Sequence, residues 1–188
     1  MPGTPINLTN QFLIAMPGMA DPNFAQSVTL ICEHNSAGAL GIVINKPLKM
    51  DLGDVFEQLG LDSADDQLVR RPVLRGGPVQ TDRGFVLHTA GTTWDSTLPF
   101  SERVHLTTSR DILDAMAGGR GPEQAIVALG YAGWEAGQLE DEMSQNAWLS
   151  VQADDRLMFT TPLEERWHEA GRLLGVNLLH LSFDAGRA

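Results

Sequence analysis

The chain has 188 residues, of which 43% are hydrophobic, and its 24 acidic and 13 basic residues give a formal net charge of −11. This length and composition predict one compact domain over residues 1–188, and the negative charge disfavours direct binding to nucleic acid or to a membrane surface. The single cysteine, Cys32, excludes an internal disulfide, and the sequence has neither a secretory leader pattern nor an apolar run of about 20 residues. We therefore expect a soluble cytoplasmic protein.

The first part of the chain predicts strands. Apolar, β-branched runs indicate strands over Phe12–Met16, Ser27–His34 and Ala39–Asn45. The polar turn Asn35–Gly38 joins the last two as a hairpin.

A helix and a polar segment follow. Asp51 is placed to cap a helix over Met50–Leu59, which Gly60 ends. The charged segment Leu61–Arg71 is the best candidate for a mobile loop, from Asp62 onward.

Further strands are predicted over Pro72–Leu74, Gly84–Thr89, Val104–Leu106, Ala125–Tyr131 and Trp148–Gln152. Thr108 or Ser109 caps a helix with Ile112, Leu113 and Met116 on one face. The last helix begins at an apparent capping box, Thr161–Glu164, and ends at Gly175. Val176–Leu181 predicts a short final strand.

The stretch Leu129–Leu149 organises these elements. It reads as a buried strand over Ala125–Tyr131, a tight glycine turn around Gly130–Gly137, and an acidic helix that begins near Trp134. No standard catalytic motif fits it.

The same stretch carries a resemblance to a known family. Gly130-Tyr131-Ala132-Gly133-Trp134, with Gly137-Gln138-Leu139-Glu140, is similar to the signature of the YqgE/AlgH family of bacterial proteins. Further matches occur at Met16–Met19, Asp21–Phe24, Cys32–His34, Gly41–Pro47, Gly76–Val79, Thr107–Asp111 and Asn146–Leu149.

The resemblance implies a single α/β domain of the mixed α+β kind, in which a mixed sheet curls into a pseudo-barrel flanked by helices. Its members are often labelled transcriptional regulators, after a proposed part in alginate control. The irregular alternation of strands and helices independently favours a mixed sheet.

Several residues are candidates for chemistry. Glu33 and His34, with Asp21 or Glu140, are residue types that bind divalent metals, although no paired-histidine spacing supports a metal site. Cys32 and His34 would share one face of a strand, but about 6.5–7 Å apart, which is beyond hydrogen-bond reach. We therefore expect no catalytic residue, no metal and no cofactor.

Two more groups have a structural and a ligand-binding interpretation. Gln138 and Glu140 either lie on an acidic helix face or form a polar pocket under the glycine turn. The cluster of Arg70, Arg71 and Arg75 is either a solvated loop or an anion site.

The first hypothesis is a non-enzymatic regulatory or protein-interaction protein whose partner and oligomeric state stay open. Its predicted binding surface contains Glu33, His34, Asn45, Gly130, Gly133, Trp134, Gln138 and Glu140. One alternative is a transcriptional regulator that contacts DNA directly, although no helix-turn-helix pattern is present. The other is a small-molecule or metal-dependent enzyme with a pocket around Glu33, His34 and Glu140.

Overall fold

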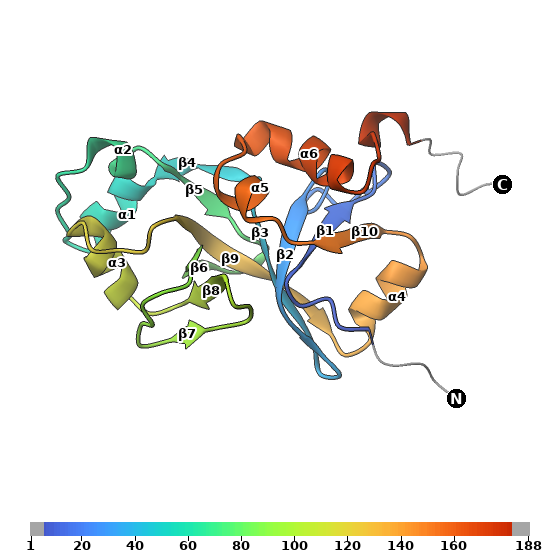
Figure 1. Ribbon diagram of the computed structural model, residues 1–188, viewed down its shortest axis with the longest axis horizontal. Coiled ribbons are helices and arrows are strands. Elements are labelled where there is room, and N and C mark those ends of the chain that lie inside the picture. The colour runs from blue at the N-terminus through green and yellow to red at the C-terminus, as the bar shows by residue number, and fades with distance from the viewer. Residues whose placement is uncertain (1–5, 182–188) are drawn as a thin grey trace.

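A ten-stranded mixed sheet forms the centre of the computed structural model, which describes residues 6–181 (Figure 1). The strands are β1 (Gln11–Ala15), β2 (Val28–Asn35), β3 (Gly38–Val43), β4 (Pro47–Asp51), β5 (Pro72–Arg75), β6 (Val79–Thr89), β7 (Thr97–Leu98), β8 (Val104–Thr107), β9 (Ala125–Glu135) and β10 (Trp148–Gln152). The helices are α1 (Leu52–Gln58), α2 (Asp66–Val69), α3 (Asp111–Ala117), α4 (Gln138–Ser144), α5 (Asp155–Phe159) and α6 (Arg166–Leu173), with 3-10 turns at Leu163–Glu165 and Leu178–His180.

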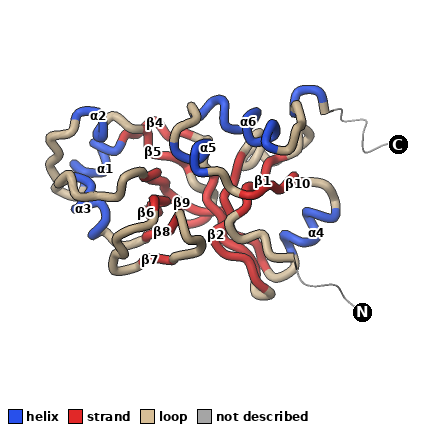
Figure 2. Tube along the Cα trace, in the orientation of Figure 1, coloured by secondary structure: helices blue, strands red, loops and turns tan. Residues whose placement is uncertain are grey.

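The strand order is β10-β1-β2-β3-β9-β6-β8-β7, with β5 beside β9 and β4 beside β5. Every strand pair in the described chain is antiparallel except β5 with β9. The sheet curls into a half-barrel flanked by helices, of which α5 and α6 pack side chains into its core (Figure 2). This arrangement confirms the predicted single α/β domain with a mixed, curled sheet flanked by helices.

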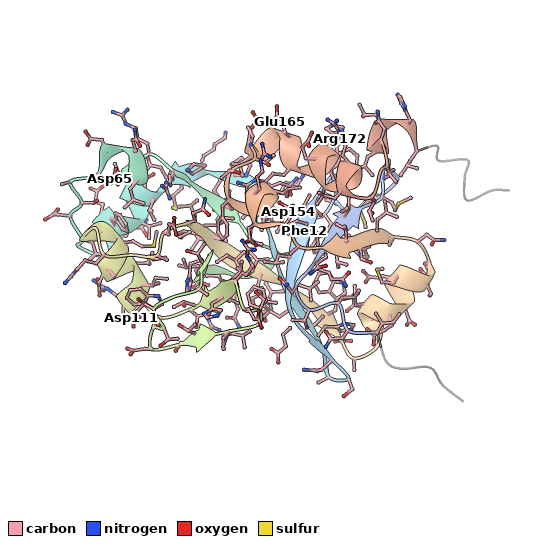
Figure 3. The ribbon with its side chains drawn as sticks, in the orientation of Figure 1. Phe12, Asp65, Asp111, Asp154, Glu165 and Arg172 are labelled. Atoms are coloured by element: carbon pink, nitrogen blue, oxygen red, sulfur yellow. The ribbon has the colours of Figure 1, made fainter. Side chains whose placement is uncertain are left out.

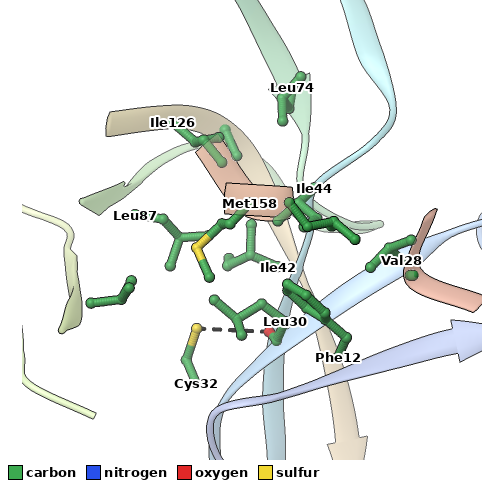
Figure 4. Packing of buried hydrophobic residues seen from close by; sticks show 14 of the residues in the cluster. Phe12, Val28, Leu30, Cys32, Ile42, Ile44, Leu74, Leu87, Ile126 and Met158 are labelled. Atoms are coloured by element: carbon green, nitrogen blue, oxygen red, sulfur yellow. Dashed lines mark hydrogen bonds between the residues drawn. The ribbon is translucent and has the colours of Figure 1, made fainter. Parts of the chain in front are cut away.

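The core divides into three clusters of buried side chains. The largest lies inside the curl, where Phe12, Leu30, Ile42 and Met158 converge from separate elements (Figure 4). A second cluster lies under α1 and α3, and a third lies under α4 around Trp134 and Leu139. Their burial supplies the main stabilisation of the fold.

Aspartates begin three of the short helices. The side chain of Asp51 accepts a hydrogen bond from the backbone N–H of Asp54, and the side chain of Asp54 accepts one from the backbone N–H of Asp51. This capping box confirms that Asp51 caps the helix, as the sequence predicted. Asp65 caps α2 and Asp154 caps α5 (Figure 3). The prediction of a loop over Leu61–Arg71 was therefore wrong at Asp66–Val69, where Asp65 caps a helical turn.

The predictions for the C-terminal part were partly wrong. No side chain caps Leu163–Glu165, and α6 begins only at Arg166, so the expected capping box is absent. Gly175 ends the helix region with a φ of +73°, as predicted. The expected strand over Val176–Leu181 is instead a 3-10 turn.

The predicted turn around Gly130–Gly137 and the helix start near Trp134 were partly wrong, because β9 continues to Glu135 and α4 starts at Gln138. Gly130 adopts a φ of +79° inside the strand, where a Cβ would lie 2.4 Å from the Gly77 carbonyl oxygen. The glycine therefore serves close backbone packing rather than a turn. Gly137, at a φ of +77°, makes the turn.

Within residues 6–181, every helix falls short of the length and apolar character that crossing a bilayer requires.

Candidate functional site

Three neighbouring strands place Glu33, Leu40 and Gly133 in one row across the sheet. Glu33 on β2 is opposite Leu40 on β3, and Leu40 is opposite Gly133 on β9. Residues opposite each other on paired strands lie on the same face of the sheet. The row therefore brings together two of the predicted surface residues, Glu33 and Gly133, with a leucine that the sequence analysis did not select.

The missing side chain of Gly133 leaves a shallow hollow of about 550 Å³ beside this row. A Cβ at Gly133 would lie 3.3 Å from Cε2 of Tyr131, so the tyrosine ring borders the space that a side chain would occupy. The hairpin hollow, as we call it, is lined by Glu33, Asn35, Ala37, Gly38, Ala39, Leu40, Val79, Tyr131, Gly133, Trp134 and Glu135.

The hollow has half-buried apolar walls and an acidic rim. Leu40 and Tyr131 pack from below against the central core, and the ring of Tyr131 meets that of Phe85 edge-on at 5.6 Å. Glu33 and Glu135 at the rim are exposed. The surface therefore suits a basic segment that carries an apolar side chain.

The strand edge beside the hollow carries no paired strand in the described chain, and the backbone N–H of Glu135 there donates to the side chain of Gln138. β9 pairs with β6 as far as Tyr131, opposite Val79. Beyond Tyr131, residues 132–135 pair with β3 on one side. Within the part of the chain that the structure describes, no strand pairs with their other side.

His34 lies behind the hollow, 5% exposed, and both ring nitrogens are occupied. The backbone N–H of Leu8 donates to Nδ1 at 3.0 Å, and Nε2 lies 2.9 Å from Oε1 of Glu140. Because Nδ1 accepts a hydrogen bond, the proton is assigned to Nε2, which donates to the carboxylate. This neutral ring joins the N-terminal segment to α4 and has no lone pair left for a metal or a substrate proton.

The hydrogen bond from His34 is the largest influence on the Glu140 carboxyl, and it lowers the pKa of that group. Asp21, the other predicted ligand, accepts from the backbone of Asn23 in a local turn. Among residues 6–181, no group of three or more His, Cys, Asp and Glu side chains is placed to hold a metal ion.

The prediction that Cys32 and His34 share one face of a strand was wrong, because the strand register shifts between Ile31 and Glu33. Cys32 packs in the central core, whereas His34 hydrogen-bonds toward α4. The bulge reverses the side-chain alternation at this point. Burial is the main cause that raises the pKa of the Cys32 thiol far above its ordinary value, so this thiol is not an activated nucleophile.

Glu142, which the sequence analysis did not select, organises the aromatic residues under α4. Its Oε1 accepts from the indole N–H of Trp134 at 3.1 Å and from that of Trp148 at 2.9 Å. Its Oε2 accepts from Gln138 at 2.9 Å, and Gln138 also accepts from the backbone N–H of Glu135. The predicted pocket shared by Gln138 and Glu140 is therefore absent, because the two side chains face different partners.

Asn45 and Gly130 lie apart from the hairpin hollow. Asn45 accepts from the backbone of Val28 and donates to the carbonyl of Gln26, so it ties a turn to the start of β2. Gly130 is buried where β9 passes Gly77. The predicted surface is thus divided, and only its Glu33–Gly133–Trp134 part forms a concave site.

The arginine cluster is divided as well. Arg75 donates to the side chain of Asn23, whereas Arg71 lines a separate cavity near α6.

A chain of hydrogen-bonded polar side chains in the other half of the sheet was not predicted from the sequence. The buried His88 contacts the carbonyl of Thr89 through Nδ1 and the hydroxyl of Thr107 through Nε2, at 2.9 and 2.7 Å. Thr107 in turn bonds Thr97. Burial is the largest influence on His88 and lowers the pKa of its ring.

Comparison with known proteins places this geometry in context. A family model described as AlgH-like matches residues 12–179. The chain is 54% identical to a UPF0301 protein of Ralstonia nicotianae over 100% of this chain and 98% of the relative, and 57% identical to one of Thioalkalivibrio sulfidiphilus over 97% of each.

Two solved structures are similar to this fold. The solution structure of AlgH from Pseudomonas aeruginosa is 50% identical, with a TM-score of 0.79, over 97% of this chain and 98% of that chain. A crystal structure of a Corynebacterium diphtheriae protein is 19% identical, with a TM-score of 0.74, over 97% and 95%, and this likeness concerns the fold alone.

Proposed function

The chain belongs to the AlgH-like family, and from that premise we propose that it is a non-enzymatic regulatory protein that binds another protein through the hairpin hollow. The observation that carries the proposal is the row Glu33–Leu40–Gly133. There the absent side chain of Gly133 leaves a hollow with half-buried apolar walls beside the exposed carboxylates of Glu33 and Glu135. A hollow with half-buried apolar walls is a suitable place for an anchor side chain of a partner.

The strand edge favours an extended partner segment. Residues 132–135 of β9 present a side that pairs with no strand in residues 6–181, and an added strand would pair there by displacing the Gln138 side chain from the backbone N–H of Glu135. The carboxylates of Glu33 and Glu135 at the rim favour basic residues next to the anchor. The proposed partner therefore offers an extended, basic segment with one large apolar side chain.

The enzymatic alternative receives less support from the same residues. Both nitrogens of His34 are occupied and Glu140 is engaged with it, so neither group is poised for proton transfer. Direct DNA contact is disfavoured by the net charge of −11.

Affinity capture with matched variants tests the proposal. Gly133→Leu fills the hollow, and the double change Glu33→Lys with Glu135→Lys reverses its rim. The control is Glu57→Lys with Glu164→Lys, which makes the same change in net charge at exposed positions of α1 and of the turn before α6. Captured proteins are quantified by mass spectrometry.

We expect one partner to be retained by the parent protein and by the control but reduced at least about tenfold by either hollow variant, which corresponds to about 1.4 kcal/mol. Equal capture by all four proteins would remove the hollow from consideration. Capture of only the chain itself would assign this surface to self-association instead.

A further inference from the structure

Arg166 is a buried cation without a carboxylate partner. The residue is 6% exposed, its Nε donates to the carbonyl of Thr161 at 2.8 Å, and its Nη1 donates to that of Ile44 at 2.6 Å. Both acceptors are neutral, and within residues 6–181 no Asp or Glu forms an ion pair with it. A buried charge in a folded protein is normally paired, so this guanidinium requires an explanation.

Its environment leaves the charge uncompensated. Burial lowers the pKa of Arg166 to about 10, because the surroundings disfavour the charged form. The group still carries its proton at neutral pH. An anion close to it would therefore be held more strongly than at an exposed arginine.

A cavity of about 360 Å³ adjoins this guanidinium. It lies between β5, the start of β9 and the segment that joins α5 to α6, which passes over β5 in Figure 1. Nη2 makes no hydrogen bond to any described residue. With Nε and Nη1 engaged, Nη2 is the nitrogen through which Arg166, which lines the cavity, would bind a ligand.

The lining of the cavity combines apolar side chains with the polar Gln124, Thr160 and Thr161 and the exposed, charged Arg71 and Glu123. Its apolar residues are Leu52, Pro72, Leu74, Met116, Ala125, Ile126, Val127, Phe159, Pro162 and Leu163. The exposed Arg71 attracts an anion, and the exposed Glu123 disfavours a second negative charge. The balance suits a ligand with one negative charge and an apolar body.

We propose that this cavity binds a small organic monocarboxylate, whose carboxylate pairs with Arg166 and whose apolar body lies against Leu74, Met116 and Val127. Because Nε and Nη1 are engaged, the carboxylate would be held by charge-assisted hydrogen bonds from Nη2. None of the residues that line this cavity lines the hairpin hollow, so the inference stands or fails independently of the proposed protein partner.

Calorimetric titration of the full chain tests the proposal, with hexanoate and phenylacetate as probes. The methyl esters of both acids test the need for the charge, and inorganic phosphate tests whether any oxyanion suffices. We expect both acids to bind the parent protein, while the esters and phosphate bind at least about tenfold more weakly, because they lack the carboxylate that accepts the charge-assisted hydrogen bond.

Two variants and one spectroscopic signal locate the binding. Arg166→Met should weaken hexanoate binding about tenfold or more. Arg71→Glu, at an exposed position that does not depend on the core, should weaken it several-fold at low salt. In the parent protein, the Nε–H resonance of Arg166 should shift on addition of hexanoate, which keeps the test valid if Arg166→Met does not fold.

Binding of phosphate in preference to the acids would overturn the assignment of a monocarboxylate. Equal affinity for the esters, an unmoved Arg166 resonance, or no binding of any probe would overturn the site itself.

Discussion

Glu142 shows how one carboxylate can fix several elements at once. It joins β9 through Trp134, β10 through Trp148, and its own helix through Gln138. The two indole rings lie 6.2 Å apart, and Phe24 packs against both. The sequence shows an acidic run at Glu140–Glu142, but it does not show which member faces inward.

Replacement of Glu142 with alanine should therefore destabilise the fold. Two indole N–H groups on buried tryptophans would lose their acceptor, at an expected cost of about 2–4 kcal/mol in the free energy of unfolding. Urea unfolding followed by far-UV circular dichroism measures the loss. Asp141→Ala on the same helix is the control and should cost at most about 1 kcal/mol through the helix dipole. Equal losses in both variants would mean that the hydrogen bonds to Glu142 contribute nothing specific.

His88 should make stability depend on pH below the ordinary histidine pKa of 6.5. Burial lowers the pKa of the folded ring, and the neighbouring His105 lowers it further. As the pH falls below 6.5, the unfolded chain takes up a proton that the folded chain still refuses, so the contribution of His88 to stability is present above 6.5 and declines toward the folded pKa.

The test compares the parent protein with His88→Gln from pH 7.5 to pH 5. The stability difference in favour of the parent should shrink as the pH falls, and urea unfolding at each pH measures it. A difference that stays constant across this range would contradict the assignment.

At the scale of the element, features set by neighbouring residues were predicted from the sequence, whereas the full extent of β9 was not. The early hairpin, the capped helix after Asp51 and the stop at Gly175 depend on local turn and capping preferences, and all three were predicted. The continuation of β9 past Tyr131 was missed, because Gly130 and Gly133 indicate a turn when only their neighbours in sequence are considered.

The glycines of β9 are explained by contacts with distant segments. Gly130 meets Gly77, and Gly133 leaves room beside Tyr131. The residues of the candidate site are likewise brought together by contacts between segments that are distant in sequence. Glu33 and Gly133 are brought together by the pairing of β2, β3 and β9, and the register shift at Cys32 turns His34 away from them. Neither the pairing nor the shift can be read from residue spacing.

The close approach of Gly77 to β9 gives a prediction for this element. A Cβ on Gly77 would lie 2.1 Å from the carbonyl carbon of Tyr131, at a φ of +157°. Gly77→Ala should therefore cost at least about 3 kcal/mol or prevent folding, because only backbone movement can relieve the overlap. Gly84→Ala on β6 is the control. There a Cβ would meet no heavy atom within 4 Å, and the change should stay below about 1 kcal/mol in chemical unfolding. A stable Gly77→Ala variant would show that the segment between β5 and β6 need not pass so close to β9.

For the molecule as a whole, the charge and the two concave sites suggest separate tasks. A net charge of −11 supports solubility and favours basic partners. The hairpin hollow is open and acidic at its rim, whereas the cavity beside Arg166 is smaller and holds a buried cation. A protein that binds a partner at one site and a small acid at the other could couple the two, provided that the acid binds more tightly to one conformation.

The central claim is that the hairpin hollow is where a protein partner binds, and site-specific photo-crosslinking in cells tests it most directly. A photo-reactive amino acid is placed at Ala37, an exposed residue that lines the hollow, and separately at Lys49, an exposed residue of β4 outside it. We predict that the Ala37 position yields one defined covalent adduct, which disappears when Gly133→Leu is added, and that the Lys49 position does not yield this adduct. An adduct that forms equally from Lys49, or that persists after the hollow is filled, would contradict the claim.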